Sequence, residues 1–300
     1  MTNFNINHSN CLADAYKDAF LFTKSHYENF PVVSIFIPAQ LRKHIAIIYQ
    51  FARQADDIAD EGNLSKEKRL QKLEEYGNLL TSSLNGEPGN IFWEALLNTI
   101  HTKELNPEYF YALLKAFKQD VVKHRYENYN ELLGYCNNSA NPVGRLVLEL
   151  YSIRENSSLV KSDYICTALQ LVNFYQDVNI DYSKGRIYLP IDEMKKYGFT
   201  ENHLELKLNN DNFKMLIRFQ LERVGILFEK GIELIYDLPK PLNFQIYWII
   251  LSGKKMIQKI KNIDYNTLNI RPKLTKLDRI NLLLKSLSVK NKKWKTNQER

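Results

Sequence analysis

The stretch IAIIYQFARQADDIAD, residues 45–60, places Asp56 and Asp60 four residues apart behind an apolar and aromatic run. Tyr49 precedes Arg53 by four residues and Asp56 follows Arg53 by three, so one helical stripe carries all of these side chains. Burying so much charge is costly unless ions or partner groups neutralise it. The stretch is therefore either a solvated helix surface or part of a site that holds cations.

The composition of the 300-residue chain favours a mostly helical protein. The chain is 44% hydrophobic and 12% aromatic, and its 11 Gly and 9 Pro leave few helix breakers. Helical periodicity dominates, with neither a fixed repeat nor a convincing pair of alternating strands. We therefore expect one all-α domain over residues 1–300, with a basic C-terminal tail over about 265–300.

The expected helices follow from periodic runs bounded by breakers. Their ranges are 9–26, 39–60, 65–84, 91–104, 106–125, 128–151 with an interruption at NNSANPVG, 162–185, 210–236 and 240–262. Gly62 is expected to cap the C-terminus of the second of these helices. Ser162 is expected to cap the N-terminus of the 162–185 helix, and Gly185 is expected to end it.

The cysteines and the apolar runs predict a cytoplasmic protein. Cys11, Cys136 and Cys166 form no CxxC pair, which indicates a reducing compartment without a disulfide framework. The first twenty residues lack the pattern of a signal peptide. The longest apolar run, FQIYWIILSG at 244–253, is about half of the roughly 18 residues that a membrane span needs.

Positive charge gathers at the C-terminal end of the chain. Residues 253–300 hold 14 Lys and Arg against 3 Asp and Glu, a net charge of +11, whereas the remainder carries −4. No recognised nucleic-acid-binding motif accompanies this charge, so nucleic acid is not expected as a partner. The segment DRINLLLKSLSV favours a last helix that packs on the core, and peripheral contact with an anionic membrane surface is the alternative.

A second polar stripe follows in LQLVNFYQDVNIDYSKGRIYLP, residues 169–190. Asp177 and Asp181 are again four apart, and Gln170 and Asn173 extend the stripe. Two such helices facing each other across a bundle would point four carboxylates inward, and these ligands suit Mg²⁺ that is shared with substrate phosphates. The predicted metal ligands are Asp56, Asp60, Asp177 and Asp181.

Basic and aromatic residues accompany both stripes. Arg53, Lys184 and Arg186 lie near the acids in sequence and are suited to hold phosphate oxygens. Aromatic side chains are suited to wall a water-poor cavity for a carbocation, although at helical spacing each is more often plain core. The aromatic candidates are Tyr27, Phe30, Phe36, Tyr49, Phe51, Tyr135, Phe174, Tyr175 and Tyr188.

Together, YQFARQADDIAD and QLVNFYQDVNIDYSKGRIYLP resemble the two aspartate-rich motifs of the squalene/phytoene synthases, which are head-to-head prenyl-diphosphate enzymes. The resemblance covers nearly the whole chain, and both motifs and the GRIYLP tail keep the order and spacing of the family. It implies an isoprenoid-synthase helical bundle, dependence on Mg²⁺ and a central hydrophobic cavity for C15 or C20 chains.

Further stretches resemble the bacterial hydroxysqualene synthases of hopanoid biosynthesis: SHYENFPVVSIFIPAQLRKHI, CNNSANPVGRLVLELY and NIRPKLTKLDRINLL. This resemblance implies a carbon–oxygen lyase that ionises presqualene diphosphate and captures water to give hydroxysqualene and diphosphate. Gln176 stands where many condensing members carry Arg, so one phosphate clamp is lost, as suits an enzyme that handles a single diphosphate.

The stripes and the resemblance imply roles for particular residues. The candidate catalytic residues are Tyr49, Arg53, Tyr135, Gln170, Asn173 and Tyr188, and the candidate substrate-binding residues are Arg53, Lys184, Arg186, Phe30 and Phe174. Gln170 and Asn173 would position phosphate or water, or else serve as helix-packing amides. Asp57 and Glu61 are either surface charge or support for the metal ligands, and His26 lies at the pocket mouth or is structural.

Two other functions remain open from the sequence. A condensing prenyltransferase would make presqualene diphosphate, squalene or phytoene from two prenyl diphosphates, and farnesyl diphosphate alone would reveal it. A non-catalytic lipid-binding or assembly relative would tend to lose motif aspartates, and all four are present.

Overall fold

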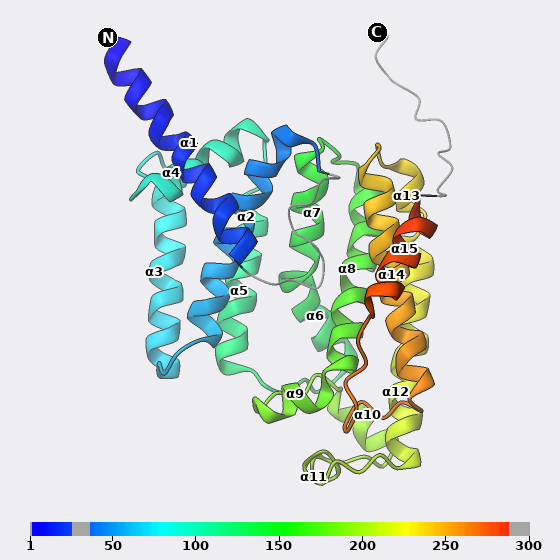
Figure 1. Ribbon diagram of the computed structural model, residues 1–300. Coiled ribbons are helices and arrows are strands. Elements are labelled where there is room, and N and C mark those ends of the chain that lie inside the picture. Colours follow the sequence, from blue (N-terminus) through cyan, green and yellow to red (C-terminus); the bar gives the residue numbers. More distant parts are fainter. Residues whose placement is uncertain (1, 26–36, 288–300) are drawn as a thin grey trace. The chain divides into compact units, whose positions relative to one another are not determined.

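The computed structural model describes residues 2–25 and 37–287, which are helical wherever they form regular structure and contain no β-strand (Figure 1). This confirms the predicted all-α class. The helices pack into two compact units, one of Met1–Val122 with Arg145–Arg154 and one of Lys123–Gly144 with Glu155–Arg300. The prediction of one domain over the whole chain stays a prediction.

The first unit is built around one central helix. Its helices are α1 (Thr2–Ser25), α2 (Ala39–Asp60), α3 (Lys66–Leu84), α4 (Ile91–Thr102), α5 (Glu108–Val122) and the larger part of α7 (Asn141–Leu150). α2 packs against α1, α3, α4 and α5. The Phe51 ring centroid lies 5.3 Å from Tyr76, 6.1 Å from Trp93 and 5.2 Å from Phe110. α2 is thus fixed by aromatic packing one turn before its acidic end.

The second unit is built on α8. Its helices are α6 (Tyr129–Ser139), α8 (Asn156–Gln176), α9 (Val178–Ser183), α10 (Ile191–Lys196), α11 (Glu201–Glu205), α12 (Asp211–Gly231), α13 (Leu234–Asp237), α14 (Leu242–Asn262) and α15 (Lys276–Ser286). α8 packs against α12 and α14. The backbones approach closely at Gly231, where a Cβ would lie 3.0 Å from the Lys161 carbonyl oxygen and 3.2 Å from the Ile165 nitrogen.

Several predicted boundaries are confirmed. α2 spans Ala39–Asp60 as expected, although its C-cap is Glu61 and the expected Gly62 follows one residue later with a φ of +74°. Ser65 caps α3 by accepting a hydrogen bond from the Lys68 amide. Gly185, with a φ of +78°, ends the second acidic segment. Local signals were sufficient here because a cap acts within one helical turn.

Other boundaries were wrong. α1 begins at Thr2, and α8 begins at Asn156, so Ser162 is a buried residue inside α8 and not its N-cap. The predicted interruption within NNSANPVG is present between α6 and α7, and it is confined to Ala140, which keeps right-handed helical dihedrals. The expected 210–236 helix divides into α12 and α13, and the first of them ends at Gly231. None of the described helices combines the length and the apolar composition needed to cross a bilayer.

Candidate active site

The first acidic motif, residues 49–61, occupies the last turns of α2. The Arg53 guanidinium lies 3.2 Å from the Asp56 carboxylate, 2.7 Å from Asp57 and 2.5 Å from Glu61. Arg53, predicted to hold diphosphate, therefore neutralises the acids of its own motif in this structure. Asp57 and Glu61 take part in the same ion-pair cluster, and both interpretations of these acids, surface charge and support for the metal ligands, stay predictions.

The acids of this motif lie at the unfavourable end of their helix. Carboxylates near a helix C-terminus face the negative end of the macrodipole. Arg69 of α3 offsets part of this cost, because its guanidinium donates to the carbonyl oxygens of Ile58, Glu61 and Gly62 at 2.8, 3.0 and 2.7 Å. No local sequence pattern predicts that Arg69 caps α2. Carboxylates that lie at a helix C-terminus despite this electrostatic cost are typical of a cation-binding site.

Tyr49 and Asp60 lie at the two ends of the first motif. Tyr49 is half-buried, and its ring centroid lies 6.4 Å from that of Phe22. Asp60 is exposed as the last residue of α2. The predicted stripe of Tyr49, Arg53, Asp56 and Asp60 therefore lies on one helix.

The second acidic motif, residues 170–186, lies where α8 gives way to α9. The expected single helix is wrong at Asp177, which leaves helical geometry with φ −106° and ψ 18°. The Asp181 amide still donates to the Asp177 carbonyl oxygen at 2.9 Å. The two aspartates thus stay one turn apart, with the chain bent at the first of them.

Asp177 is paired with a residue that the sequence analysis did not single out. Arg271 Nε lies 2.6 Å from Asp177 Oδ1, and Arg271 Nη2 lies 2.8 Å from Oδ2. Beside this pair, the buried Gln176 side chain donates from Nε2 to the Pro272 carbonyl oxygen at 2.7 Å. A bidentate guanidinium–carboxylate pair is strong and directional. These three hydrogen bonds dock the segment at 266–275 on the end of α8.

A cavity of about 120 Å³ opens at this docked segment. Gln176, Asp177 and Asn179 line one side of it, and Thr267 and Arg271 line the other. Arg271 lies in the stretch NIRPKLTKLDRINLL, which resembles the hydroxysqualene synthases. This resemblance was the only feature of the sequence that could have pointed to Arg271 as a site residue.

Three predicted aromatic residues come together in the second unit. Phe174 and Tyr188 are stacked with ring centroids 3.7 Å apart and planes inclined by 5°. Tyr135 lies 6.1 Å from Phe174 and 6.0 Å from Tyr188. Tyr126, which the sequence analysis missed, lies 5.7 Å from Tyr188. All four rings are buried and form an aromatic cluster.

Backbone pairing holds the GRIYLP segment against this cluster. The Ile187 amide donates to the His124 carbonyl oxygen at 2.9 Å, and the Ile191 amide donates to the Tyr126 carbonyl oxygen at 2.9 Å. Both bonds join segments more than sixty residues apart in the sequence. These two bonds hold Tyr188 against Phe174. They thereby place the segment that follows the second acidic motif in the sequence beside the aromatic cluster.

A small cavity borders the stacked rings. It has a volume of about 10 Å³ and is lined by Phe174, Asp181, Arg186 and Tyr188, together with apolar neighbours. This volume is about the least that holds one water molecule. Asp181, predicted to bind metal, and Arg186, predicted to bind phosphate, thus border one cavity with two predicted aromatic residues. The predicted central hydrophobic cavity for a prenyl chain stays a prediction.

The remaining candidates are dispersed. On α8, Gln170 is half-buried and Asn173 is exposed one turn before Asp177, while Lys184 is exposed at the end of α9. Phe51 and Tyr175 are ordinary core: Phe51 is buried in the first unit, and the buried Tyr175 hydroxyl donates to Gln220 Oε1 at 2.8 Å. His26, Tyr27, Phe30 and Phe36 lie outside the described residues.

The donor chemistry of both motifs fits Mg²⁺. Among residues 2–25 and 37–287, no three acidic, His or Cys side chains gather closely enough to form a metal cluster by themselves. Mg²⁺ does not need a closed cage, because it commonly takes one or two carboxylates and completes its shell with water and substrate phosphates. The exposed or half-buried carboxylates of Asp56, Asp60, Asp177 and Asp181 meet this requirement in each motif. That the two motifs face each other stays a prediction.

The family model for squalene/phytoene synthase matches residues 23–278, and the chain belongs to this family. The resemblance inferred from the two motifs, and with it the predicted class of enzyme, is thereby confirmed. The family acts on prenyl diphosphates and generally depends on a divalent metal ion.

Within the family, the chain is similar to proteins named hydroxysqualene synthase. The protein from Zymomonas mobilis subsp. mobilis is 42% identical over 62% of this chain and 63% of its own length. The protein from Rhodopseudomonas palustris is 38% identical over 79% of this chain and 80% of its own length. The crystal structure of squalene synthase HpnC from Alicyclobacillus acidocaldarius is similar with a TM-score of 0.81 and 34% identity, over 85% of this chain and 96% of that one. The isoprenoid-synthase fold is thereby confirmed.

Proposed function

We propose that this chain is a hydroxysqualene synthase that acts on presqualene diphosphate with Mg²⁺. The observation that carries this choice is the water-sized cavity where Asp181 and Arg186 border the stacked Phe174 and Tyr188 rings. A reaction that ends in capture of one water needs such a place beside a wall that stabilises a cation. The names of the relatives from Zymomonas and Rhodopseudomonas support the same choice.

In the proposed reaction, the bond between carbon and the diphosphate oxygen breaks first. Mg²⁺, when bound, offsets the negative charge on the departing diphosphate. Arg186 is the cationic side chain that lines the cavity, and we assign it to diphosphate oxygens together with Arg53 and Lys184. These groups act most strongly where water is excluded.

The cation then rearranges beside the aromatic cluster. The faces of Phe174 and Tyr188 carry negative potential and attract a nearby cation. Both rings are buried, so they exclude bulk water that would quench the cation early. One water adds to the rearranged cation, forming a carbon–oxygen bond, and the products are hydroxysqualene, diphosphate and one proton.

We assign Asp56, Asp60, Asp177 and Asp181 as the carboxylates that hold the metal ions. Each motif places one guanidinium on its acids, Arg53 on Asp56 and Arg271 on Asp177. A metal ion held by these carboxylates would share them with the two guanidinium groups. Arg53 and Arg271 would then also be placed to bind diphosphate oxygens, because Arg matches phosphate oxygens in the same forked geometry.

The test is incubation of the purified protein with presqualene diphosphate and Mg²⁺, with the product identified by mass spectrometry. In H₂¹⁸O, we expect hydroxysqualene that carries one ¹⁸O atom. Farnesyl diphosphate alone is the matched control and should yield no product. Formation of squalene, or of presqualene diphosphate from farnesyl diphosphate, would replace this proposal with the condensing alternative. Absence of turnover on every prenyl diphosphate would favour a non-catalytic relative.

We further propose a cytoplasmic location with peripheral contact at the inner face of the membrane. A substrate with two long prenyl chains resides in a bilayer and not in water, since each buried CH₂ contributes about 0.8 kcal/mol. The net charge of +11 over residues 253–300 supports contact with anionic lipid.

A further inference from the structure

α15 has one face that is packed and one that is not. Its Asp278 carboxylate lies 2.8 Å from Lys259 Nζ and 3.6 Å from Lys255 Nζ, both on α14. Thr275 and Asp278 form a capping box at its N-terminus, and Ser286 is buried at its other end. Figure 1 shows α15 (red) lying along α14 (orange). The helix is therefore well anchored through the face that carries Asp278 and Ser286.

The opposite face of α15 displays large apolar side chains. Leu277, Ile280, Leu284 and Leu287 follow a 3, 4, 3 spacing, which places them on one stripe. Each of the four residues is between 54% and 72% exposed. Other exposed large apolar residues in the described part of the chain are spread over separate segments. A gathered apolar stripe of this kind marks an interaction surface.

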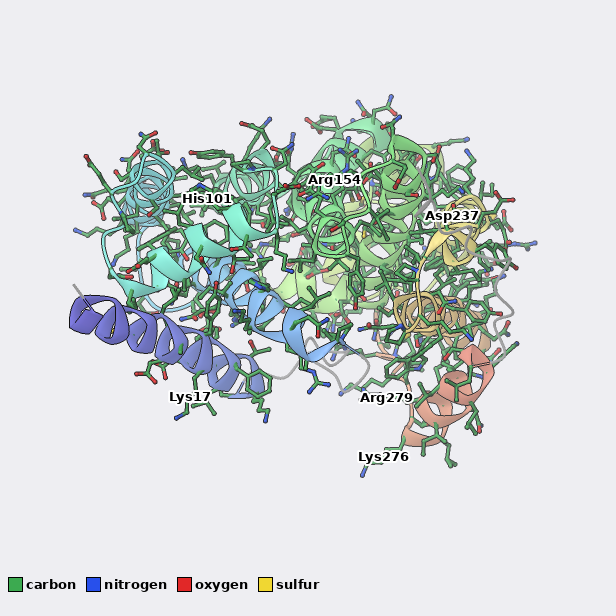
Figure 2. All side chains as sticks on the ribbon, turned by 90° about the horizontal axis from the view of Figure 1, so that it is seen from above. Lys17, His101, Arg154, Asp237, Lys276 and Arg279 are labelled. Carbon is green, nitrogen blue, oxygen red and sulfur yellow. The ribbon has the colours of Figure 1, made fainter. Side chains whose placement is uncertain are left out.

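Positive charge frames this stripe. Lys276 and Lys285 lie at its two flanks on the helix, and Lys273 lies in the segment before it, all three exposed. In Figure 2, Lys276 extends from the outer edge of the helix. The sequence after Leu287 adds five more Lys and Arg against one Glu. Apolar residues within a basic frame are typical of a helix that lies in a membrane interface.

We propose that the outer face of α15 docks on an anionic lipid bilayer. Leu277, Ile280, Leu284 and Leu287 enter the boundary between headgroups and acyl chains, and the flanking lysines contact lipid phosphates. A second copy of the chain fits this face poorly, because a symmetric dimer would bring identical basic frames together. This inference specifies the proposed membrane contact and is independent of the proposed reaction.

Docking through α15 gives the second unit a defined orientation at the lipid surface. The contact is interfacial, since none of the described helices has the length and hydropathy of a span. Attraction between Lys or Arg and anionic lipid is screened by salt. Binding through α15 is therefore expected to be reversible and sensitive to ionic strength.

The test is co-sedimentation of the full-length protein with vesicles of phosphatidylcholine, with and without phosphatidylglycerol, in the absence of substrate and metal. We expect binding to the anionic vesicles that weakens as salt is added, and little binding to the neutral ones. The double substitution Leu277→Gln with Leu284→Gln should lower partitioning at least about tenfold, because it removes the apolar anchor. The double substitution Lys273→Glu with Lys276→Glu should lower it on anionic vesicles alone.

The matched control is Leu206→Gln with Ile226→Gln, two similarly exposed residues of the same unit outside α15. This control should bind vesicles as the wild type does, and far-ultraviolet circular dichroism should show that all variants are folded. The proposal is overturned if the α15 variants bind vesicles like the wild type, or if the wild type binds neutral and anionic vesicles equally. It is also overturned if sedimentation velocity shows a dimer that the Leu277 and Leu284 substitutions dissociate. Failure of the proposed reaction would leave these vesicle results unchanged.

Discussion

The two acidic motifs share their spacing and differ in how their charge is neutralised. In the first motif, Arg53 of the same helix pairs with Asp56, Asp57 and Glu61. In the second, Asp177 pairs with Arg271, which lies 94 residues further along the chain. One motif is therefore complete within three helical turns, and the other depends on a docked distant segment. Similar sequence patterns thus lead to one local site and one tertiary site.

Asp60 ends α2 and Asp177 directly follows the C-terminal end of α8, where carboxylates are least favoured, whereas Asp181 lies in the first turn of α9. In each case a distant residue secures the end of the helix, Arg69 at α2 and Pro272 at α8. A shared unfavourable position with dedicated support is what a cation-binding function would explain.

The largest expected effect comes from removing one acid in each motif. Asp56→Asn and Asp177→Asn should each lower turnover of presqualene diphosphate by at least about 100-fold, because charge on the departing diphosphate loses its counterion. Initial rates measure this effect, and thermal unfolding checks that the fold is retained. Glu67→Gln on the exposed face of α3 is the control and should leave the rate unchanged. A large loss in one variant alone would show that only one motif binds metal.

The next effect concerns the helix of the first motif. Burial lowers the pKa of His44 on α2 to about 4, with Lys43 and Lys103 adding to the shift, and His44 Nδ1 lies 2.9 Å from Thr99 Oγ1. As pH falls below 6.5, the unfolded chain takes up the proton first. Stability is therefore lost between pH 6.5 and about 4, by at most about 3 kcal/mol.

Urea unfolding at a series of pH values measures this loss. His44→Gln should remove most of the dependence between pH 6.5 and 4, whereas His101→Gln, at an exposed position on α4, should keep it. An unchanged pH dependence in the His44 variant would show that the acid sensitivity of the protein arises elsewhere.

The smallest expected effect tests how the carboxylates are neutralised, by an arginine of the same helix or by one distant in the sequence. Arg271→Ala frees Asp177 from its guanidinium and should tighten Mn²⁺ binding about two- to fivefold, in line with a partly exposed ion pair. Electron paramagnetic resonance of Mn²⁺ titrated into substrate-free protein measures this change. The same substitution should speed amide exchange over residues 266–275, because the segment then loses its bonds to Asp177 and keeps those of Gln176 to Pro272 and of Asn269 to Lys207.

Arg53→Ala is the matched substitution in the first motif. It should also tighten Mn²⁺ binding, but it should leave amide exchange at 266–275 unchanged. Lys273→Ala, an exposed basic residue of the docked segment, should alter neither measurement. Weaker Mn²⁺ binding to the Arg271 variant would contradict competition between guanidinium and metal.

The sequence by itself determined the features that act within a few turns of chain. The bounds of α2 and the stop at Gly185 were predicted because helix-breaking signals and helical spacing are local, whereas the C-cap of α2 is Glu61 and not the expected Gly62. The same spacing placed Tyr49, Arg53, Asp56 and Asp60 along α2. The paired motifs were sufficient to indicate the family, because their residue types and spacing follow from the chemistry of metal and diphosphate.

Only the tertiary structure decided which groups meet across long stretches of chain. Ser162 looks like a cap in sequence, yet it lies inside α8, because packing against α12 extends the helix back to Asn156 through residues of low helix propensity. The pair of Asp177 with Arg271 and the stack of Phe174 on Tyr188 depend on where packing places separate segments. Periodicity carries no information about such distant partners, since it reports only the face on which a residue lies. The free energy that fixes those partners comes from burial and directional hydrogen bonds formed once the helices pack.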